Sequence, residues 1–328
     1  MRSIPLVVLL LTAPIAAQQL DGSFNLRASD SDDRININLR YEDGRSNYGR
    51  MLERSAFSNV TQSGDRITFT LRREPGSFSF EGKGSMERAS GWYGFSPSQT
   101  FRQELERLGF KDVDGRHLFV FALDDLSVAK VKQLQQLVSN PLDTDELVQM
   151  INHGAGFKYV QSMTEMGFKK LTSEEYRRAR DHGVSAEFAR EMADLGMKLS
   201  LGELIRSRDH GVSVEYVRAM RSAGFDVGHD ELIRARDHGV SADFLRRMRA
   251  LGHDRLTLDE FVRMRDHGVT PDFVESLRSL GYTSLSADEL VRLRDHGVSA
   301  SYIERVKGAL KEKPSVEELI RMRSHGHR

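Results

Sequence analysis

A histidine–glycine pair recurs at nearly constant spacing along the C-terminal part of this 328-residue chain. The histidines follow one another at intervals of 28 or 29 residues: His153, His182, His210, His238, His267, His296 and His325. A period of this kind indicates a fold in which copies of one small unit stack on their neighbours. The spacing therefore predicts a repeat architecture, and no other feature of the sequence limits the choice of fold as much.

Each unit is predicted to begin with a short helix that opens on a capping box. In this motif a Ser or Thr hydroxyl and a later Glu bond the free backbone N–H groups of the first turn. The pairs are Thr172/Glu175, Ser200/Glu203, Thr257/Glu260, Ser286/Glu289 and Ser315/Glu318, and Gly228 replaces the hydroxyl residue once. The helix ends at the glycine of the histidine–glycine pair, because glycine tolerates the left-handed closing conformation.

A second helix follows in each unit, with Ser185, Ser213, Ser241, Thr270 or Ser299 as its cap. One hairpin of this size buries too little surface to offset its ordering entropy, so neighbouring hairpins must share a core. We therefore expect an α-solenoid of two-helix repeats over residues 127–328, beginning with the second-helix analogue "SVAKVKQLQQLV". In the last helix we expect incomplete cover of Leu319, Ile320 and Met322.

The segment before the repeats alternates apolar and polar residues, as strands do. In "RININLRY" the side chains of Ile35, Ile37, Leu39 and Tyr41 are predicted to share one face. The runs "FNLR", "RITFTLRR", "GSFSFEG", "GWYGFS" and "HLFVFAL" are also predicted strands, and "SPSQTFRQELERLGF" is the one predicted helix. The predicted fold is α+β: a small antiparallel β-rich domain with one helix at residues 20–125, followed by the solenoid.

The N-terminal segment "MRSIPLVVLLLTAPIAAQQ" has the features of a secretory signal, with small residues at Ala16 and Ala17 before Gln18. We predict a signal peptide over residues 1–17 and an exported protein, periplasmic or secreted, with no membrane span after cleavage; a retained anchor is the alternative. The absence of cysteine excludes disulfides and thiol catalysis. The 48 basic and 48 acidic residues balance, so no overall field favours nucleic acid.

The repeated "LIRARDHGV" motif contains two arginines with different predicted environments. On a helical wheel with Leu232 at 0°, Arg234 lies near 200° and Arg236 near 40°. The first position should face solvent, and its members are candidate contacts for a partner, with a merely solvated face as the alternative: Arg206, Arg234, Arg263, Arg292 and Arg321. The second position should be half-buried in the apolar face: Arg180, Arg208, Arg236, Arg265 and Arg294.

A half-buried guanidinium needs an anionic partner. The aspartate that follows each of these arginines is the available repeating anion: Asp181, Asp209, Asp237, Asp266 and Asp295. We therefore predict a structural ladder of Arg–Asp pairs along the stack.

The remaining candidate sites favour structural interpretations. A column of histidines about one helix spacing apart cannot share a zinc ion, so we predict no metal and no cofactor. The terminal pair His325 and His327 is either an alternative ligand pair or a frayed helix end. No HExxH, GxSxG, GxxxxGK or dinucleotide motif is present. The acidic run "SDSDDRIN" reads as a solvated loop, and Trp92, Tyr93 and Phe95 as core or rim residues of the sheet.

The motifs "GRSNYG", "GSFSFEG" and "GWYGFSP", followed by tandem "LIRxRDHGV" units, resemble an uncharacterised family of bacterial exported proteins. Similar segments in that family also occur attached to zinc-metalloprotease receptors of the β-lactam-sensor type. The resemblance covers nearly the whole mature chain, although the protease signature HExxH and a multi-span membrane region are absent. It implies a sensory or scaffolding accessory in the cell envelope.

Residues and resemblance together predict a non-enzymatic repeat protein that binds an unknown protein partner in the cell envelope. Two other classes stay open: a nucleic-acid-binding helical repeat protein, and an enzyme that modifies an envelope polymer with its site in the β domain. The acidic residues interleaved with the arginines argue against nucleic-acid binding. The absence of an identifiable pair of catalytic carboxylates argues against the enzyme.

Overall fold

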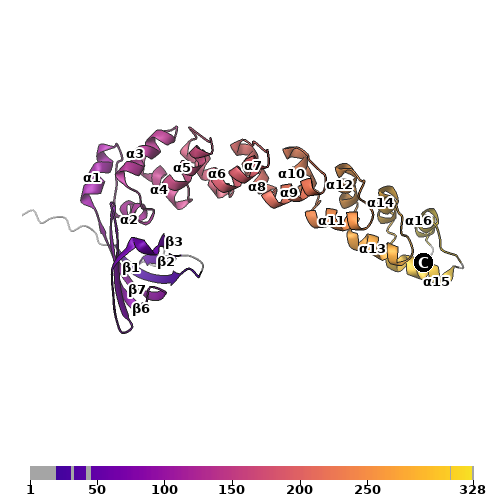
Figure 1. Cartoon of the computed structure of the whole chain (residues 1–328), viewed down its shortest axis with the longest axis horizontal. Helices are drawn as coiled ribbons and strands as arrows, with labels where there is room; N and C mark the ends of the chain where they lie inside the picture. The colour runs from indigo at the N-terminus through magenta and orange to yellow at the C-terminus, as the bar shows by residue number, and fades with distance from the viewer. Residues whose placement is uncertain (1–19, 31–32, 42–45, 311, 327–328) are drawn as a thin grey trace, which may run out of the picture. The chain divides into compact units, whose positions relative to one another are not determined.

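The computed structural model describes residues 20–30, 33–41, 46–310 and 312–326. In these ranges a seven-stranded antiparallel sheet is followed by sixteen α-helices in tandem, so the predicted α+β fold with a helical repeat region is confirmed (Figure 1). The chain divides into two compact units, the first ending at Asp181 and the second beginning at His182.

The sheet has the strand order β3-β2-β1-β7-β6-β5-β4. Its strands are β1 (Leu20–Ala28), β2 (Arg34–Tyr41), β3 (Asn47–Glu53), β4 (Phe57–Ser63), β5 (Arg66–Arg73), β6 (Gly76–Gly84) and β7 (Arg88–Pro97). The alternation in β2 is as predicted, because Ile35, Ile37 and Leu39 are buried while Asn36 and Asn38 are exposed. One face of the sheet is therefore apolar and the other polar.

Aromatic side chains fill the apolar face of a strongly curled sheet. Phe24 on β1 and Phe69 on β5 have ring centroids 5.5 Å apart, although β7 and β6 lie between their strands. In a flat sheet, strands three places apart are separated by about 14 Å. The sheet therefore bends around its core, and Phe119 closes that core by contacting Tyr41, Phe78 and Phe95.

Phe119 belongs to a helix, whereas its run "HLFVFAL" was predicted to be a strand. This prediction was wrong: α2 (Gly115–Leu123) begins after the Asp114 cap and buries every residue from Leu118 to Leu123. A short continuous apolar run has no period that separates a strand from a fully buried helix. Within its described residues, the segment 20–125 thus contains two α-helices, the predicted α1 (Gln99–Arg107) and α2.

In the first unit the helices pack in two alternating series. One series contains α1, α3 (Val128–Leu137) and α5 (Phe157–Glu165), and the other contains α2, α4 (Thr144–Asn152) and α6 (Ser173–Asp181). Because α2 packs on both β6 and β7 as well as on α4, it joins the sheet to the helices that follow. Helix pairing therefore begins before Ser127, where the first repeat-like sequence was recognised.

In the compact unit from His182 onward the same alternation is seen. The second helices of the repeats pack on one another, and so do the first helices (Figure 1). The second helices are α7 (Ala186–Asp194), α9 (Val214–Ser222), α11 (Ala242–Ala250), α13 (Pro271–Ser279) and α15 (Ala300–Ala309). The first helices are α8 (Leu201–Asp209), α10 (His229–Asp237), α12 (Leu258–Asp266), α14 (Ala287–Asp295) and α16 (Val316–Ser324).

The capping boxes and glycine stops are confirmed, for example at Ser200/Glu203 and at Gly239, whose φ is 74°. The predicted lack of cover on the last helix was wrong for two of three residues. Leu319 and Ile320 are 0% and 8% exposed, because α16 packs on α14, and only Met322 is half-buried.

Candidate functional site

The joint between successive units contains the residues that the sequence singled out. Helix α10 illustrates it: Asp237 is its last residue, His238 its C-cap and Gly239 the left-handed residue that turns the chain toward α11. The arginines, the aspartate and the histidine all lie within this last turn, where they reach the neighbouring units.

The aspartates of the joint bind histidines of the preceding unit. His238 Nδ1 lies 2.6 Å from Asp266 Oδ1, and both side chains are a little more than 40% exposed. The equivalent pairs are His153–Asp181 at 2.8 Å, His182–Asp209 at 2.6 Å, His210–Asp237 at 2.8 Å and His267–Asp295 at 2.6 Å. The predicted Arg–Asp pairing was therefore wrong: a ladder exists, but an imidazole takes the place of the guanidinium.

The arginines assigned to that ladder lie on aromatic rings instead. The Arg236 guanidinium carbon is 5.3 Å from the centroid of the Tyr216 ring. The same stacking joins Arg180 to Tyr159, Arg208 to Phe188, Arg265 to Phe244, Arg294 to Phe273 and Arg323 to Tyr302. A ring face attracts a cation without a carboxylate, which explains why these arginines do not need the aspartate.

The stacked arginines are also less buried than predicted. Arg180, Arg208, Arg236 and Arg294 are exposed, and only Arg265 is half-buried. Each arginine lies against the glycine of the histidine–glycine pair in the preceding repeat. For example, a Cβ added at Gly239 would lie 3.1 Å from Arg265 Nη2. The glycine is therefore needed both for its left-handed backbone and for the approach of the guanidinium.

The candidate contact row is exposed, as predicted, but four of its five arginines have a carboxylate partner in the next unit. Arg234 Nη1 lies 2.6 Å from Asp259 Oδ1, and the two side chains are 52% and 75% exposed. The other pairs are Arg206–Asp230 at 3.0 Å, Arg263–Asp288 at 2.5 Å and Arg292–Glu317 at 2.9 Å. The hydrogen bond from Arg292 lowers the pKa of the Glu317 carboxyl.

Arg321, the fifth member of the row, is exposed and has no ion-pair partner within the described ranges. The row is therefore a stripe of alternating positive and negative side chains along α8, α10, α12, α14 and α16. We call it the charged stripe. The acidic members of the charged stripe were not predicted from the sequence, although an acidic residue recurs in the first turn of α10, α12, α14 and α16.

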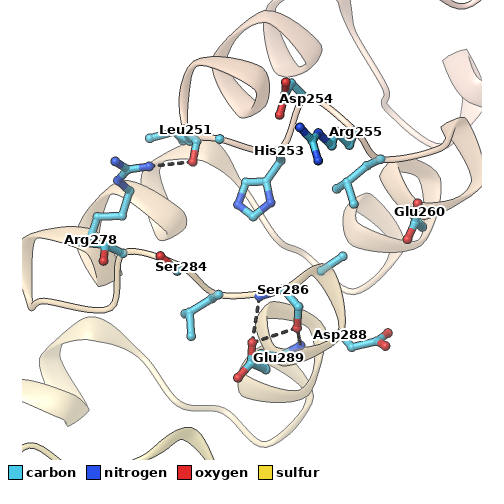
Figure 2. A pocket seen from close by; sticks show the side chains of 15 residues that line it. Leu251, His253, Asp254, Arg255, Glu260, Arg278, Ser284, Ser286, Asp288 and Glu289 are labelled. Atoms are coloured by element: carbon cyan, nitrogen blue, oxygen red, sulfur yellow. Dashed lines mark hydrogen bonds between the residues drawn. The ribbon is translucent and has the colours of Figure 1, made fainter.

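A separate hollow of about 680 Å³ opens beside His253, between the loop after α11 and the segment before α14 (Figure 2). His253 follows the glycine that ends the second helix of its repeat. The equivalent residues in other repeats are Phe168, Met197, Phe225 and Tyr282, so His253 places an imidazole where those repeats have a largely apolar side chain. Burial, followed by the charge of Arg278, lowers the pKa of His253. The Arg278 guanidinium itself donates to the Leu251 carbonyl at 2.6 Å.

The two glutamates that line this hollow already have hydrogen-bond partners. Glu289 accepts from the Ser286 backbone N–H at 2.8 Å in its capping box (Figure 2). Glu260 accepts from the Thr257 backbone N–H at 2.7 Å in the same way. A general acid or base must be placed to exchange a proton with a bound substrate. Both glutamates instead cap helix starts, so neither is placed as a free acid or base in this hollow.

The aromatic residues of β7 divide between the two faces of the sheet. Tyr93 and Phe95 are 3% and 0% exposed, which confirms their prediction as core residues. Trp92 is 68% exposed although β7 is the central strand, so it belongs neither to the core nor to the rim. The alternation of side chains along a strand accounts for the difference.

Several sequence predictions fall outside the described residues: the signal peptide at 1–17, His327, and Ser31 and Asp32 of the acidic run. Within the described ranges no group of three His, Asp or Glu residues is placed to hold a metal ion. His325 Nδ1 lies 2.8 Å from the Arg321 carbonyl oxygen of its own helix. No helix in the described part of the chain is both long and apolar enough to cross a membrane.

Comparison of the sequence with known protein families and with curated proteins finds no match.

Proposed function

We propose that the helical repeats form a non-enzymatic scaffold that binds a protein partner through the charged stripe. The supporting observation is the recurrence of one exposed Arg–carboxylate contact between successive first helices, from Arg206–Asp230 to Arg292–Glu317. Stacked units place these pairs in a row, which gives a partner several equivalent contacts on one surface.

The exposure of the pairs supports a role in recognition over a role in stability. Ion pairs between solvated side chains contribute about 0–1 kcal/mol, because water screens them and two long side chains lose freedom. In the Arg234–Asp259 pair both side chains are at least half exposed. Charges of both signs on an open face can match a partner of complementary pattern, and they repel partners that lack it.

The same pairs argue against nucleic acid as the partner. A phosphate backbone is bound by cations that track it, and its affinity comes from displaced counterions. In the charged stripe each of Arg206, Arg234, Arg263 and Arg292 already has a carboxylate within 3.0 Å. A polyanion would have to displace or repel these acids at every unit.

Affinity capture with charge-neutral variants of the full chain tests this proposal. The triple variant Arg234→Gln, Arg263→Gln, Arg292→Gln removes the central cations of the stripe. The matched control is Arg246→Gln on α11, because Arg246 is 75% exposed and also pairs with an aspartate, but lies on a second helix. Both variants should keep the thermal melting curve of the parent, since the altered side chains are solvated.

The expected result is a protein captured by the parent chain and by the control, and lost with the triple variant. Equal capture by the triple variant would refute the stripe as the contact surface. A captured species that absorbs as nucleic acid and disappears on nuclease treatment would replace the proposal with the nucleic-acid alternative.

We also propose that the protein acts in the bacterial cell envelope. The support is the signal-like N-terminal sequence before Gln18. Fractionation of producing cells, followed by N-terminal sequencing, should find the chain outside the cytoplasm and starting at Gln18. An unprocessed chain in the cytoplasmic fraction would contradict it.

A further inference from the structure

The polar face of the sheet carries one exposed aromatic side chain among mainly hydrophilic ones. Trp92, the single tryptophan of the chain, is 68% exposed on the central strand β7. Its register neighbours are Ser23 on β1 and Glu81 on β6. The neighbours of Trp92 on the polar face of β7 are Ser90, two residues before it, and Gly94, two residues after it. Both residues are small, so neither side chain covers the indole.

One hollow adjoins this tryptophan, and a second lies next to the first. The first, of about 680 Å³, is lined by Trp92, Gly91, Gly82, Glu81 and Ser90, among others. The second, of about 380 Å³, is lined by Asn25, Asn38, Arg27 and Arg88. Because Ser90 and Lys83 line both, the two hollows are adjacent on the polar face, and together we call them the groove.

The far end of the groove holds two arginines without anionic partners. Arg27 on β1 and Arg88 on β7 lie directly opposite each other in the register, and neither has an ion pair within the described ranges. Like charges directly opposite on neighbouring strands destabilise a sheet. An anion bound between them would relieve this repulsion.

The Trp92 end of the groove has the opposite character. Glu81 lies beside the indole in the register, and its carboxylate pairs with Arg66 at 2.7 Å. Lys83, which lines both hollows, lies 3.4 Å from Asp65. The Trp92 end of the groove therefore offers an aromatic face, a carboxylate acceptor and hydroxyl groups, without unpaired positive charge.

We propose that this groove binds an oligosaccharide that bears carboxylate groups. The C–H bonds of a sugar ring carry partial positive charge and pack on the electron-rich face of an indole. Sugar hydroxyls can donate to the Glu81 carboxylate, and they can both donate to and accept from the Ser90 hydroxyl and the Asn25 and Asn38 amides. Arg27 and Arg88 lie opposite each other in the register, and a guanidinium group can bind a carboxylate in fork geometry.

The length of the groove sets the size of the ligand. Trp92 and Arg88 are four residues apart on one strand, which corresponds to about 13 Å along the sheet. A single sugar ring cannot span that distance, so the ligand is an oligomer with an acidic group displaced from the stacked ring. A single-stranded nucleic acid fits less well, because it needs cations along its whole backbone and Glu81 stands beside the stacking position.

The single tryptophan makes the test direct, since its emission reports on this groove alone. The full chain is titrated with a galacturonic acid tetramer, a neutral glucose tetramer and an oligothymidylate, with Trp92 fluorescence as the readout. The uronate tetramer should change the emission saturably, and the neutral tetramer should bind at least about tenfold more weakly. Added salt should weaken the uronate complex.

Variants assign the two ends of the groove. Arg27→Gln and Arg88→Gln should each weaken uronate binding about tenfold, whereas Arg72→Gln, an exposed arginine on the same face of β5, should leave it unchanged. Trp92→Ala, followed by calorimetry, should abolish binding. All altered side chains are exposed, so unchanged melting curves show that the sheet is intact.

Three outcomes would overturn the proposal: no response to the uronate tetramer, equal binding by Arg27→Gln and Arg88→Gln, or an oligothymidylate that binds at least as tightly as the uronate. These readouts concern the sheet, and they are independent of partner capture by the helical repeats.

Discussion

The imidazole of His238 contacts the carboxylate of Asp266 across the joint between α10 and α12, at 2.6 Å between Nδ1 and Oδ1. Asp266 ends α12, where the helix dipole disfavours a negative charge. The histidine that caps the preceding first helix supplies the compensating hydrogen bond. The histidine of one repeat and the aspartate of the next are therefore best understood as partners in one contact.

A double-mutant cycle measures this contact. Asp266→Asn and His238→Gln should each lower the free energy of unfolding, and the coupling between them should be about 0.5–1 kcal/mol in urea unfolding experiments. The value is small because both side chains are a little more than 40% exposed. A control cycle between His238 and Asp254, an exposed loop aspartate, should show no coupling. Equal coupling in the two cycles would argue against a specific pair.

Substitution at Gly239 tests the glycine stop. Its φ is 74°, and an added Cβ would press on the Arg265 guanidinium at 3.1 Å. Gly239→Ala should therefore destabilise the fold by about 1–2 kcal/mol. Gly202→Ala, inside α8 with nothing within 4 Å of an added Cβ, should stabilise it by up to about 1 kcal/mol. Chemical denaturation of both variants checks the opposite signs.

The repeat could be predicted from the sequence because its signals are local. A capping box such as Ser200/Glu203 and a stop such as Gly239 act within one helix, and a fixed spacing reveals them without knowledge of tertiary contacts. Contacts between units are different. Helical-wheel angles place Arg236 relative to its own helix only. They do not place it relative to the Tyr216 ring on which it stacks, and they do not show that His210 binds Asp237, the predicted partner of Arg236.

The candidate sites on the sheet were harder to predict for a related reason. Alternation in "RASGWYGFSP" separates Trp92 from Tyr93, but the pairing of Arg27 with Arg88 depends on which strands are neighbours. The β1–β7 register joins residues 61 to 75 positions apart, from Arg27↔Arg88 to Leu20↔Phe95, and no local pattern encodes it. The helix at "HLFVFAL" was missed because burial on all sides erases the periodicity.

Asp124 should make stability depend on pH in the first unit. Burial raises the pKa of its carboxyl from 3.8 to about 6, even though the nearby Arg50 lowers it. The folded chain thus holds this proton more tightly than the unfolded chain. The resulting stabilisation is full below pH 4 and is lost as the pH rises from about 4 to 6.

The variant Asp124→Asn stays neutral throughout this range. Relative to the parent it should be more stable by about 1–3 kcal/mol at pH 7 and by nearly nothing at pH 3.5. Urea unfolding at the two pH values checks the difference, and Asp145→Asn, at an 83% exposed position, is the control that should show little change. A gain for Asp124→Asn that is equal at both pH values would contradict the pKa assignment.

The last joint lacks the aspartate, which allows the ladder to be extended by design. Ser324 occupies the aspartate position of α16, and its hydroxyl lies 3.4 Å from His296 Nδ1, compared with 2.6 Å in the His267–Asp295 pair. Ser324→Asp should form a sixth pair and raise the free energy of unfolding by about 0.5 kcal/mol. In a His296→Gln background the same substitution should destabilise the chain, because a carboxylate at a helix C-terminus then faces the dipole without a compensating imidazole. Urea unfolding of the four proteins checks this reversal of sign; a gain that persists without His296 would show that the aspartate acts through some other contact.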